Sequence, residues 1–402
     1  MELSGTMQPL ALSCFGVATS LGAGRAATLA ALRAGSSGLR PSTLDHAPSP
    51  IYVGEVPGLD AAPLTGDLAA FDCRNHRLAA MALRQDGFAD AVAAARERYG
   101  AERIGVFLGT STSGLQHSEA AYRRRDRATG ALPADYDYAR THNTYSLGDF
   151  LRASLALAGP AFVVSAACAT TGKVFATAAR MIAAGLCDAA IVGGADTLCA
   201  TTLYGFRSLN VMSEEPCRPF DAERSGISIG EAAGFALLER PVAAKDGGGV
   251  LLLGVGESSD AYHMSSPHPE GLGARLAMER ALAAAGLGPR DVDYVNLHGT
   301  ATPVGDAAED RAVSELLGSA TPCSSTKGCT GHTLGASGIV EAVFSALAIL
   351  HDMVPGSPHT RTVDPAFRCN YVVATETARI DRVMSNSFGF GGANCSLLLG
   401  RA

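Results

Sequence analysis

The chain has 402 residues, of which 47% are hydrophobic and only 18% are charged. This length allows one large fold or two ordinary domains, and the composition is typical of a compact α/β protein rather than a disordered or fibrous one. The net charge of −7 argues against general nucleic-acid binding.

The start of the chain and its cysteines indicate a cytoplasmic protein. The first seven residues contain no basic segment and no continuous apolar run, so we expect no secretory signal there. The ten cysteines form no Cys-x-x-Cys pair and no even framework, which favours free thiols. No segment reaches the roughly 18 uninterrupted apolar residues of a membrane helix. Residues 174–193 come closest, but Arg180 and Asp188 interrupt them.

Short apolar runs alternate with alanine-rich stretches along the chain. The apolar runs predict strands at 9–15, 103–108, 161–166, 189–193, 250–256, 293–297, 371–374 and 394–399. The alanine-rich stretches predict helices at 26–34, 77–96, 173–185, 274–285, 306–317 and 338–350. This alternation favours βαβ units and largely parallel sheets.

A short segment rich in glycine, at 241–249, predicts a linker between two halves, 8–245 and 246–402. The halves share features. In each, a strand enters a Gly-Thr-x-Thr loop, at 109–112 and at 299–302. Each half also has a turn of small residues before a long apolar helix, at 167–172 and 331–338. These similarities predict two duplicated α/β units with an active site between their loops, and chance similarity of glycine-rich loops is the alternative.

Cys168 lies between a predicted strand and a predicted helix. A helix N-terminus directs backbone N–H groups at such a residue and favours thiolate over thiol, which suggests a reactive cysteine. A cysteine among alanines is equally typical of a small buried core residue. The local sequence leaves both interpretations open.

Polar residues in the second half of the chain favour a reactive Cys168 over a core cysteine. His298 follows a predicted strand, where α/β proteins form their ligand-binding crevice. Lys327 and His332 lie in a loop before the last long helix. The glycines of the segment 387–394 permit unusual backbone turns, while its aromatic residues could simply belong to the core.

Taken in order, Cys168 and three later motifs resemble the β-ketoacyl-acyl-carrier-protein synthases, the condensing enzymes of the thiolase superfamily. The motifs are HGTATPVGDAAE at 298–309, STKGCTGHTLGASG at 325–338 and NSFGFGGAN at 386–394. The resemblance covers nearly the whole chain, from Gly16 to Asn394. It implies an α/β fold, a duplicated thiolase-like αβαβα five-layered sandwich that is normally dimeric.

The resemblance also implies the roles of the central residues. Cys168 would accept the acyl chain as a covalent thioester. His298 and His332 would stabilise the enolate formed when malonyl-acyl-carrier protein loses carbon dioxide. Lys327 would supply positive charge and pair with Glu309.

Other residues receive supporting roles from the same resemblance. The backbone amides of Cys168 and Phe390 would form the oxyanion hole, with Phe390 and Phe388 at the gate between the two substrate pockets. The remaining implied residues are Asp306 and Glu341 as support, Thr300 and Thr302 for the phosphopantetheine arm, and Thr112 in the acyl pocket.

The implied partner is acyl carrier protein, which is acidic. Because this chain is also acidic, docking requires a local basic patch, for which Arg74, Arg77, Arg124 and Arg207 are the candidates. We expect a homodimer, or a heterodimer with a paralogue resembling a chain-length factor. We expect no metal, no nucleic-acid or membrane partner, and no cofactor besides the phosphopantetheine of the carrier protein.

Some residues depart from the housekeeping members of the family. Thr112 is polar where the family shapes the far end of the acyl pocket, and Ser265 replaces a common threonine. These departures favour a specialised branch, similar to the synthases of aryl polyene pigments, with a substrate other than a plain long saturated chain. The alternatives are the active subunit of a ketosynthase/chain-length-factor heterodimer, a non-catalytic subunit, and a CoA-dependent thiolase. The pair His298 and His332 disfavours the thiolase.

Overall fold

Two sets of five strands, one from each half of the chain, have the same order and the same directions. In the computed structural model, which describes residues 6–45, 47–241 and 249–402, both sets belong to one continuous sheet. The first set runs in the order β1 (Leu10–Thr19), β9 (Ala232–Glu239), β7 (Ala189–Asp196), β5 (Ile104–Gly109) and β6 (Ala161–Val164). The second runs β10 (Val250–Ser259), β17 (Ala393–Arg401), β16 (Arg382–Gly389), β11 (Tyr294–Asn296) and β12 (Pro322–Ser324).

The strand directions repeat as well. β5 is parallel to both of its neighbours, as is β11, while the strands nearer the centre of the sheet pair antiparallel. The two sets meet where β1 and β10 pair through Leu10–Leu252 and Ala11–Leu251. The shared order supports the predicted duplication, whereas the predicted boundary between residues 245 and 246, and most of the predicted linker, lie outside the described residues.

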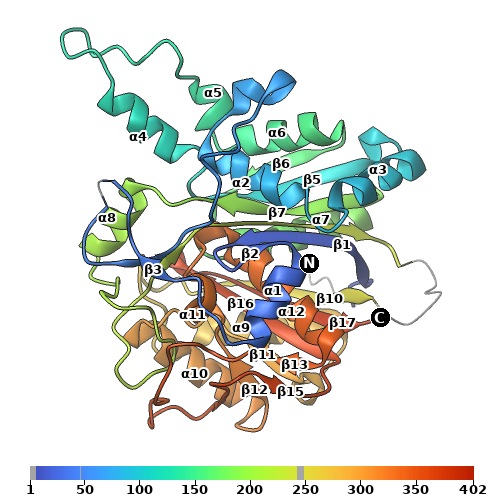
Figure 1. Cartoon of the computed structure of the whole chain (residues 1–402). Helices are drawn as coiled ribbons and strands as arrows, with labels where there is room; N and C mark the ends of the chain where they lie inside the picture. Colours follow the sequence, from blue (N-terminus) through green and yellow to red (C-terminus); the bar gives the residue numbers. More distant parts are fainter. Residues whose placement is uncertain (1–5, 46, 242–248) are drawn as a thin grey trace.

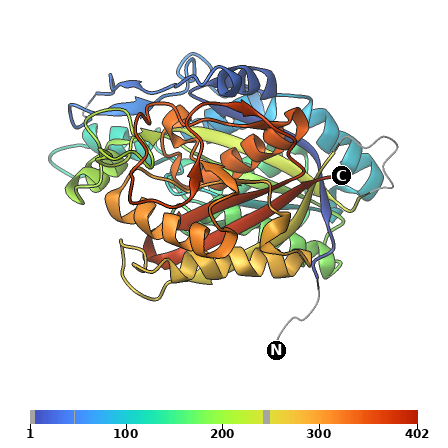
Figure 2. The ribbon, with the colours of Figure 1, turned by 90° about the horizontal axis from the view of Figure 1, so that it is seen from below.

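The helices form three layers around these strands (Figure 1). α7 (Thr170–Ala183) and α12 (Ser337–His351) contact each other and strands of both halves, so they form the central layer. The outer layer of the N-terminal half contains α2 (Arg74–Leu83), α3 (Phe88–Tyr99) and α6 (Ser146–Leu155). The outer layer of the C-terminal half contains α9 (Leu272–Ala285) and α10 (Pro303–Leu317), and α9 is drawn in gold in Figure 2. The layers therefore have the predicted αβαβα order.

Shorter elements connect these layers. The short helices are α1 (Arg25–Arg33), α4 (Leu115–Arg123), α5 (Tyr138–Thr141), α8 (Ala200–Ser208) and α11 (Lys327–Thr330), with 3₁₀ turns η1 (Gly66–Phe71), η2 (Ala101–Arg103), η3 (Pro289–Asp291), η4 (Leu334–Ala336) and η5 (Phe390–Gly392). The short strands are β2 (Gly22–Ala23), β3 (Arg40–Pro41), β4 (Tyr52–Gly54), β8 (Ile229–Gly230), β13 (Met353–Val354), β14 (Asn370–Tyr371) and β15 (Glu376–Thr377).

The central layer is the most deeply buried part of the protein. Every residue from Ser337 to Ile349 in α12 is buried, as expected of a helix that is apolar on all sides. The stretch Leu334–His351 has the length and hydropathy of a membrane span, but 89% of it lies inside the fold. We therefore identify it as a core helix.

The structure corrects several predicted elements. The helix predicted at 77–96 is two helices, because Asp86 and Gly87 adopt left-handed backbone angles that end α2. The sequence interpretation missed β9 and β16 entirely, and the strand predicted at 371–374 is reduced to the two residues of β14. β9 reads AAGFALLE, in which alanine and leucine favour a helix, but it is fully buried between β1 and β7.

Glycine is required where β7 and β9 lie against each other. Gly193 has a φ of +141°, and a Cβ atom there would lie 2.1 Å from the carbonyl oxygen of Gly234. A side chain would have to push the two strands apart.

We expect Gly193→Ala to lower the free energy of unfolding by at least about 2 kcal/mol, from steric overlap and backbone strain. Denaturant unfolding measures this. Gly205→Ala in α8 is the matched control, since its Cβ would meet nothing within 4 Å, and it should stabilise by up to about 1 kcal/mol. Equal stability of the two variants would contradict the strand contact.

Candidate active site

Cys168 lies in a strained turn between β6 and α7. The preceding residue, Ala167, has a φ of +49°, a left-handed conformation that is uncommon for alanine. The Thr170 hydroxyl stabilises the turn, since it accepts a hydrogen bond from the Ala166 amide at 2.7 Å and donates to the Ala167 carbonyl oxygen. This geometry places the sulfur at the entrance of the central layer, where the sequence predicted a reactive thiol.

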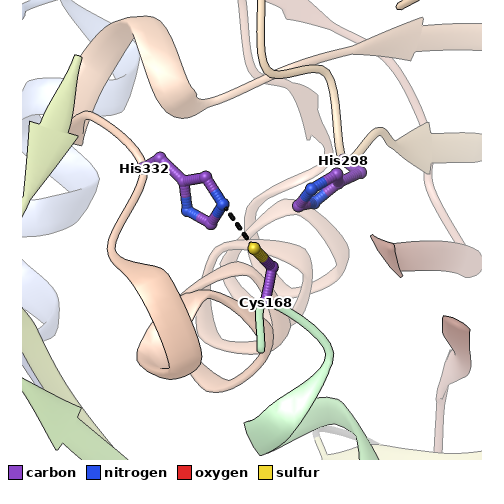
Figure 3. Close-up of side chains that lie close together, drawn as sticks. All are labelled: Cys168, His298 and His332. Atoms are coloured by element: carbon purple, nitrogen blue, oxygen red, sulfur yellow. Dashed lines mark hydrogen bonds between the residues drawn. The ribbon is translucent and has the colours of Figure 1, made fainter. Parts of the chain in front are cut away.

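The same sulfur contacts a histidine from the other half of the chain (Figure 3). The Nε2 atom of His332 lies 2.9 Å from the Cys168 Sγ atom. The opposite ring nitrogen, Nδ1, accepts the backbone N–H of Leu334 at 3.1 Å and lies 3.0 Å from the Ser337 hydroxyl. A neutral histidine whose Nδ1 accepts a hydrogen bond carries its proton on Nε2. His332 therefore directs an N–H group toward Cys168.

A close helix contact brings these two residues together. A Cβ atom on Gly338 would lie 2.4 Å from the backbone nitrogen of Gly172. The N-terminal turns of α7 and α12 thus touch through two glycines. Cys168 precedes α7 and His332 precedes α12, so both side chains reach the same point.

His298 completes the group from a third loop. Its ring is perpendicular to that of His332, with 5.3 Å between the centroids. Two carboxylates of α10 hold the loop. Glu309 accepts the backbone N–H groups of His298 and Gly299 at 2.8 and 2.7 Å. Asp306 accepts those of Thr300 and Ala301 at 2.9 and 3.1 Å, so both residues support the site.

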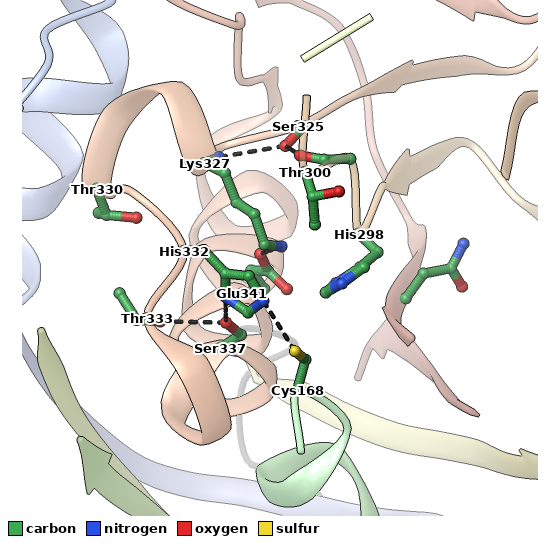
Figure 4. Close-up of polar contacts among 12 residues, drawn as sticks. Cys168, His298, Thr300, Ser325, Lys327, Thr330, His332, Thr333, Ser337 and Glu341 are labelled. Carbon is green, nitrogen blue, oxygen red and sulfur yellow. Dashed lines mark hydrogen bonds and ion pairs between the residues drawn. The ribbon is translucent and has the colours of Figure 1, made fainter. Parts of the chain in front are cut away.

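The partner of Lys327 differs from the prediction. Its ammonium forms a buried ion pair with Glu341 of α12 (Figure 4). The oxygens of Glu309 instead accept the backbone N–H groups of the His298 loop. The predicted Lys327–Glu309 pair is therefore wrong. Glu341 was expected only as a supporting residue, and it holds Lys327 beside the histidines.

Burial keeps the central groups neutral. It lowers the pKa of both His298 and His332 well below the usual value, and the charge of Lys327 lowers them further. Burial also raises the pKa of the Cys168 thiol to about 11, although Lys327 and the backbone amides of Phe390 and Cys168 act in the opposite direction. The sequence favoured a thiolate from the helix N-terminus alone, but burial outweighs that effect.

Two cavities meet at Cys168. The first, of about 270 Å³, is lined by both histidines, Thr300, Thr302 and Phe388. The second, of about 470 Å³, lies on the other side of the cysteine and is lined by Thr112 together with residues of α8 and η4. The predicted phosphopantetheine and acyl-pocket residues thus line two different cavities.

Phe390 lines both cavities and separates them. Its ring lies 5.7 Å from that of Phe206, which also lines both. Phe388 lines only the first cavity, and its ring centroid lies 6.0 Å from that of His298. This is the placement expected for a gate at Phe390.

The four predicted docking arginines separate into two groups. Arg74 is buried and forms ion pairs with Glu231, Glu55 and Asp60, so its predicted docking role is wrong. Arg77 is engaged by both carboxylate oxygens of Asp72.

Arg124 and Arg207 have the exposed side chains. Arg207 directly follows Phe206 in α8, beside the cavities. These two remain candidates for docking.

Cys168, His298 and His332 could also suggest a metal site, since their ligand atoms lie within 4.8 Å of one another. A metal on Nε2 of His332 would require the proton on Nδ1, which already accepts the Leu334 amide. The arrangement fits a hydrogen-bond donor better than a metal ligand.

The sequence interpretation assigned no role to Ser337 or Asn386. Ser337 contacts His332, and Asn386 donates to Glu309 at 3.2 Å. Ser337 lies in the motif at 325–338 and Asn386 in the motif at 386–394, so membership of these motifs was the sequence signal for a role of both residues. A degradative thiolase would carry a second reactive cysteine in its C-terminal region, but Cys395 packs against Gly172 in the core and lines neither cavity.

Comparisons with known proteins agree with this geometry. The family profiles described as "Beta-ketoacyl synthase, N-terminal domain" and "Beta-ketoacyl synthase, C-terminal domain" match residues 9–244 and 250–361. The "3-oxoacyl-[acyl-carrier-protein] synthase 2" of Staphylococcus aureus (strain COL) is 34% identical over 83% of this chain and 86% of its own.

A second relative is the mitochondrial "3-oxoacyl-[acyl-carrier-protein] synthase" of Arabidopsis thaliana. It is 43% identical over 60% of this chain, a match that spans only 56% of the relative's own length. Among solved structures, the ketosynthase ApeO in complex with its chain length factor ApeC from Xenorhabdus doucetiae superposes with a TM-score of 0.88. That match has 39% identity and covers 98% of both chains.

The raised pKa of Cys168 predicts an unusual pH dependence of alkylation. Because the thiolate is the reactive form, the rate of Cys168 carbamidomethylation by iodoacetamide should keep rising above about pH 9, where ordinary cysteine levels off. Lys327→Met should shift the rise to still higher pH. Site-resolved mass spectrometry measures both, and a plateau below about pH 8 would instead indicate a stable thiolate.

Proposed function

We propose that this chain, which belongs to the β-ketoacyl synthase family, elongates acyl chains in a specialised polyene or polyketide pathway. In this proposal it is the catalytic subunit of a heterodimer. Its reaction is that of a 3-oxoacyl-[acyl-carrier-protein] synthase, an acyltransferase that condenses an acyl-enzyme thioester with malonyl-acyl-carrier protein. The observation that carries this function is the neutral histidine pair beside Cys168, with the N–H group of His332 directed at the sulfur.

The first half-reaction loads Cys168. The sulfur attacks the carbonyl carbon of the carrier thioester, a new carbon–sulfur bond forms, and the bond to the phosphopantetheine sulfur breaks. The cysteine proton leaves with the departing carrier thiol. The backbone amides of Cys168 and Phe390 lie near the sulfur and are the donors for the negative oxygen of this intermediate.

The second half-reaction forms the new carbon–carbon bond. Malonyl-carrier protein loses carbon dioxide, and the bonding electrons remain as an enolate. Neutral histidines suit this step, because they stabilise the enolate oxygen by donating N–H hydrogen bonds without protonating the carbon. The enolate carbon then attacks the acyl thioester, and Cys168 leaves as the thiolate, which takes up a proton from solvent to regenerate the thiol. This sequence requires no cofactor besides the carrier's phosphopantetheine.

An edge strand supports the proposed heterodimer. Among the described residues, β6 pairs only with β5 and ends the sheet, and Phe162 in this strand is 49% exposed. An exposed edge strand of this kind offers unpaired backbone groups to another chain. The superposed ketosynthase ApeO is itself in complex with a chain length factor, which favours a related paralogue over a second copy as the partner.

The retained catalytic residues weigh against the non-catalytic alternative. A subunit that only shapes a partner's pocket has no use for a reactive cysteine in a strained turn with two histidines beside it. A CoA-dependent thiolase is disfavoured because Cys395 is buried in the core away from both cavities.

Cys168→Gln should abolish condensation while preserving the fold. The purified protein, with its partner subunit if one is required, is incubated with an acyl-carrier thioester and malonyl-carrier protein, and product mass is measured. We expect loss of the 3-oxoacyl product by at least about a thousandfold, since the thioester intermediate cannot form. Cys329→Ser, at a buried cysteine outside both cavities, is the control. Condensation by Cys168→Gln would show that another residue is the nucleophile.

Charge reversal at Arg124 and Arg207 tests carrier docking. Arg124→Glu and Arg207→Glu should lower kcat/KM about tenfold for carrier-bound acyl groups and leave small pantetheine thioesters unchanged, because only the carrier contacts the surface charge. Arg98→Glu, at an arginine whose side chain is 54% exposed and outside both cavities, is the control. Equal slowing with both substrate types would refute docking at these residues.

A further inference from the structure

A single buried carboxylate joins two loops that line the cavity of Thr112. Asp196, at the end of β7, is fully buried. Its Oδ1 atom accepts the backbone N–H groups of Ser111 and Thr112, both at 2.7 Å. The same oxygen accepts the hydroxyls of Thr110 and Thr112 at 2.9 and 2.8 Å. The other oxygen, Oδ2, accepts the backbone N–H of Ala336 at 3.2 Å.

These five hydrogen bonds fix two walls of the cavity relative to each other. The loop after β5 contributes Ser111 and Thr112 to the lining, and η4 contributes Leu334 and Gly335. The walls are in close contact, because a Cβ atom on Gly335 would lie 2.7 Å from both Asp196 Oδ2 and Ser111 Oγ. The Asp196 carboxylate therefore lies between the loop after β5 and η4.

The carboxylate also determines what Thr112 presents to the cavity. The Thr112 hydroxyl donates to Asp196 and accepts the backbone N–H of Thr197 at 3.0 Å. Since the hydroxyl is fully engaged inside the protein, the methyl group is the part of the side chain left to contact a ligand. The wall at Thr112 is thus apolar, contrary to the expectation of a polar pocket end from the sequence.

The same turn reaches the catalytic histidine. Leu334 of η4 lines the cavity and also donates its backbone N–H to His332 Nδ1. The position of η4 thereby affects both the pocket wall and the proton on His332.

We propose that Asp196 is a positioning residue that sets the far wall of the acyl pocket, selecting an apolar chain that ends against the Thr112 methyl group. This inference rests on the proposed function, since it takes the second cavity as the site of the Cys168-bound acyl chain. Replacing the carboxylate by an amide leaves one acceptor oxygen, which would keep the four hydrogen bonds at the Oδ1 position, so the NH2 group would face the Ala336 N–H. η4 would be pushed away from the loop after β5, and the wall against which a long chain packs would lose its shape.

The experiment measures acylation of Cys168 by intact-protein mass spectrometry. The protein, with its partner subunit if one is required, is given saturated acyl pantetheine thioesters from acetyl to dodecanoyl. In Asp196→Asn, we expect the ratio of long-chain to acetyl loading to fall at least about tenfold, with acetyl loading changed by less than about threefold. An unchanged ratio in a folded Asp196→Asn variant would overturn the proposal.

Asp310→Asn is the matched control. Asp310 is also buried and accepts two backbone N–H groups, those of Arg368 and Cys369, both at 2.9 Å. It lines neither cavity, so its substitution should leave the ratio unchanged. An equal fall in both variants would mean that general destabilisation is the cause and would overturn the proposal.

A second variant tests the wall if Asp196→Asn does not fold. Thr112→Ser keeps the hydroxyl bonded to Asp196 and removes only the methyl group, so the loading of longer chains should rise relative to acetyl. No change in chain-length preference would overturn the proposal. Failure of the unmodified protein to form any acyl-Cys168 would instead refute the proposed function.

Discussion

The contact between Gly172 and Gly338 is the constraint on which the active site depends. A side chain at Gly338 would separate the N-terminal turns of α7 and α12, because its Cβ atom would lie 2.4 Å from the Gly172 backbone nitrogen. The Thr171 hydroxyl reinforces this contact, because it donates to the Gly335 carbonyl oxygen at 2.6 Å and accepts the backbone N–H of Ile339 at 3.0 Å. The strained turn of Cys168 and the loop of His332 converge because each precedes a buried helix of the central layer. The N-terminal turns of these two helices, one from each duplicated half, touch each other.

Burial in that layer determines the chemistry available to the site. Cations and anions are costly away from water, so burial favours neutral histidines and a protonated cysteine. The charge of Lys327 is compensated by Glu341 from α12 itself. A site of this kind provides hydrogen-bond donors rather than strong bases. That suits a reaction whose carbanion is generated by loss of carbon dioxide.

In our proposal, short segments around the catalytic centre adapt it to particular substrates. The second cavity at Cys168 is lined by residues of α8, η4 and the loop after β5. Asp196 connects two of these segments and also adjoins the turn that orients His332. In the proposed assembly the partner chain covers the edge of β6 in the N-terminal half, whereas the cavity that selects the substrate is lined by both halves of the chain.

The sequence by itself determined the family, the layered fold and the identities of Cys168, His298, Lys327 and His332. These follow from local motifs, in which a few neighbouring residues specify a turn, a helix start or a nucleophile. Local patterns were insufficient for β9, whose alanines and leucines favour a helix until neighbouring strands bury them.

Only the tertiary structure decided which charges pair. It assigned Glu341 rather than Glu309 to Lys327, buried Arg74 among three carboxylates, and turned the Thr112 hydroxyl toward Asp196. Each of these outcomes depends on distances of a few ångströms between segments far apart in the chain. Such distances are set by the packing of whole layers, whereas a sequence motif encodes only the conformational preferences of its own residues.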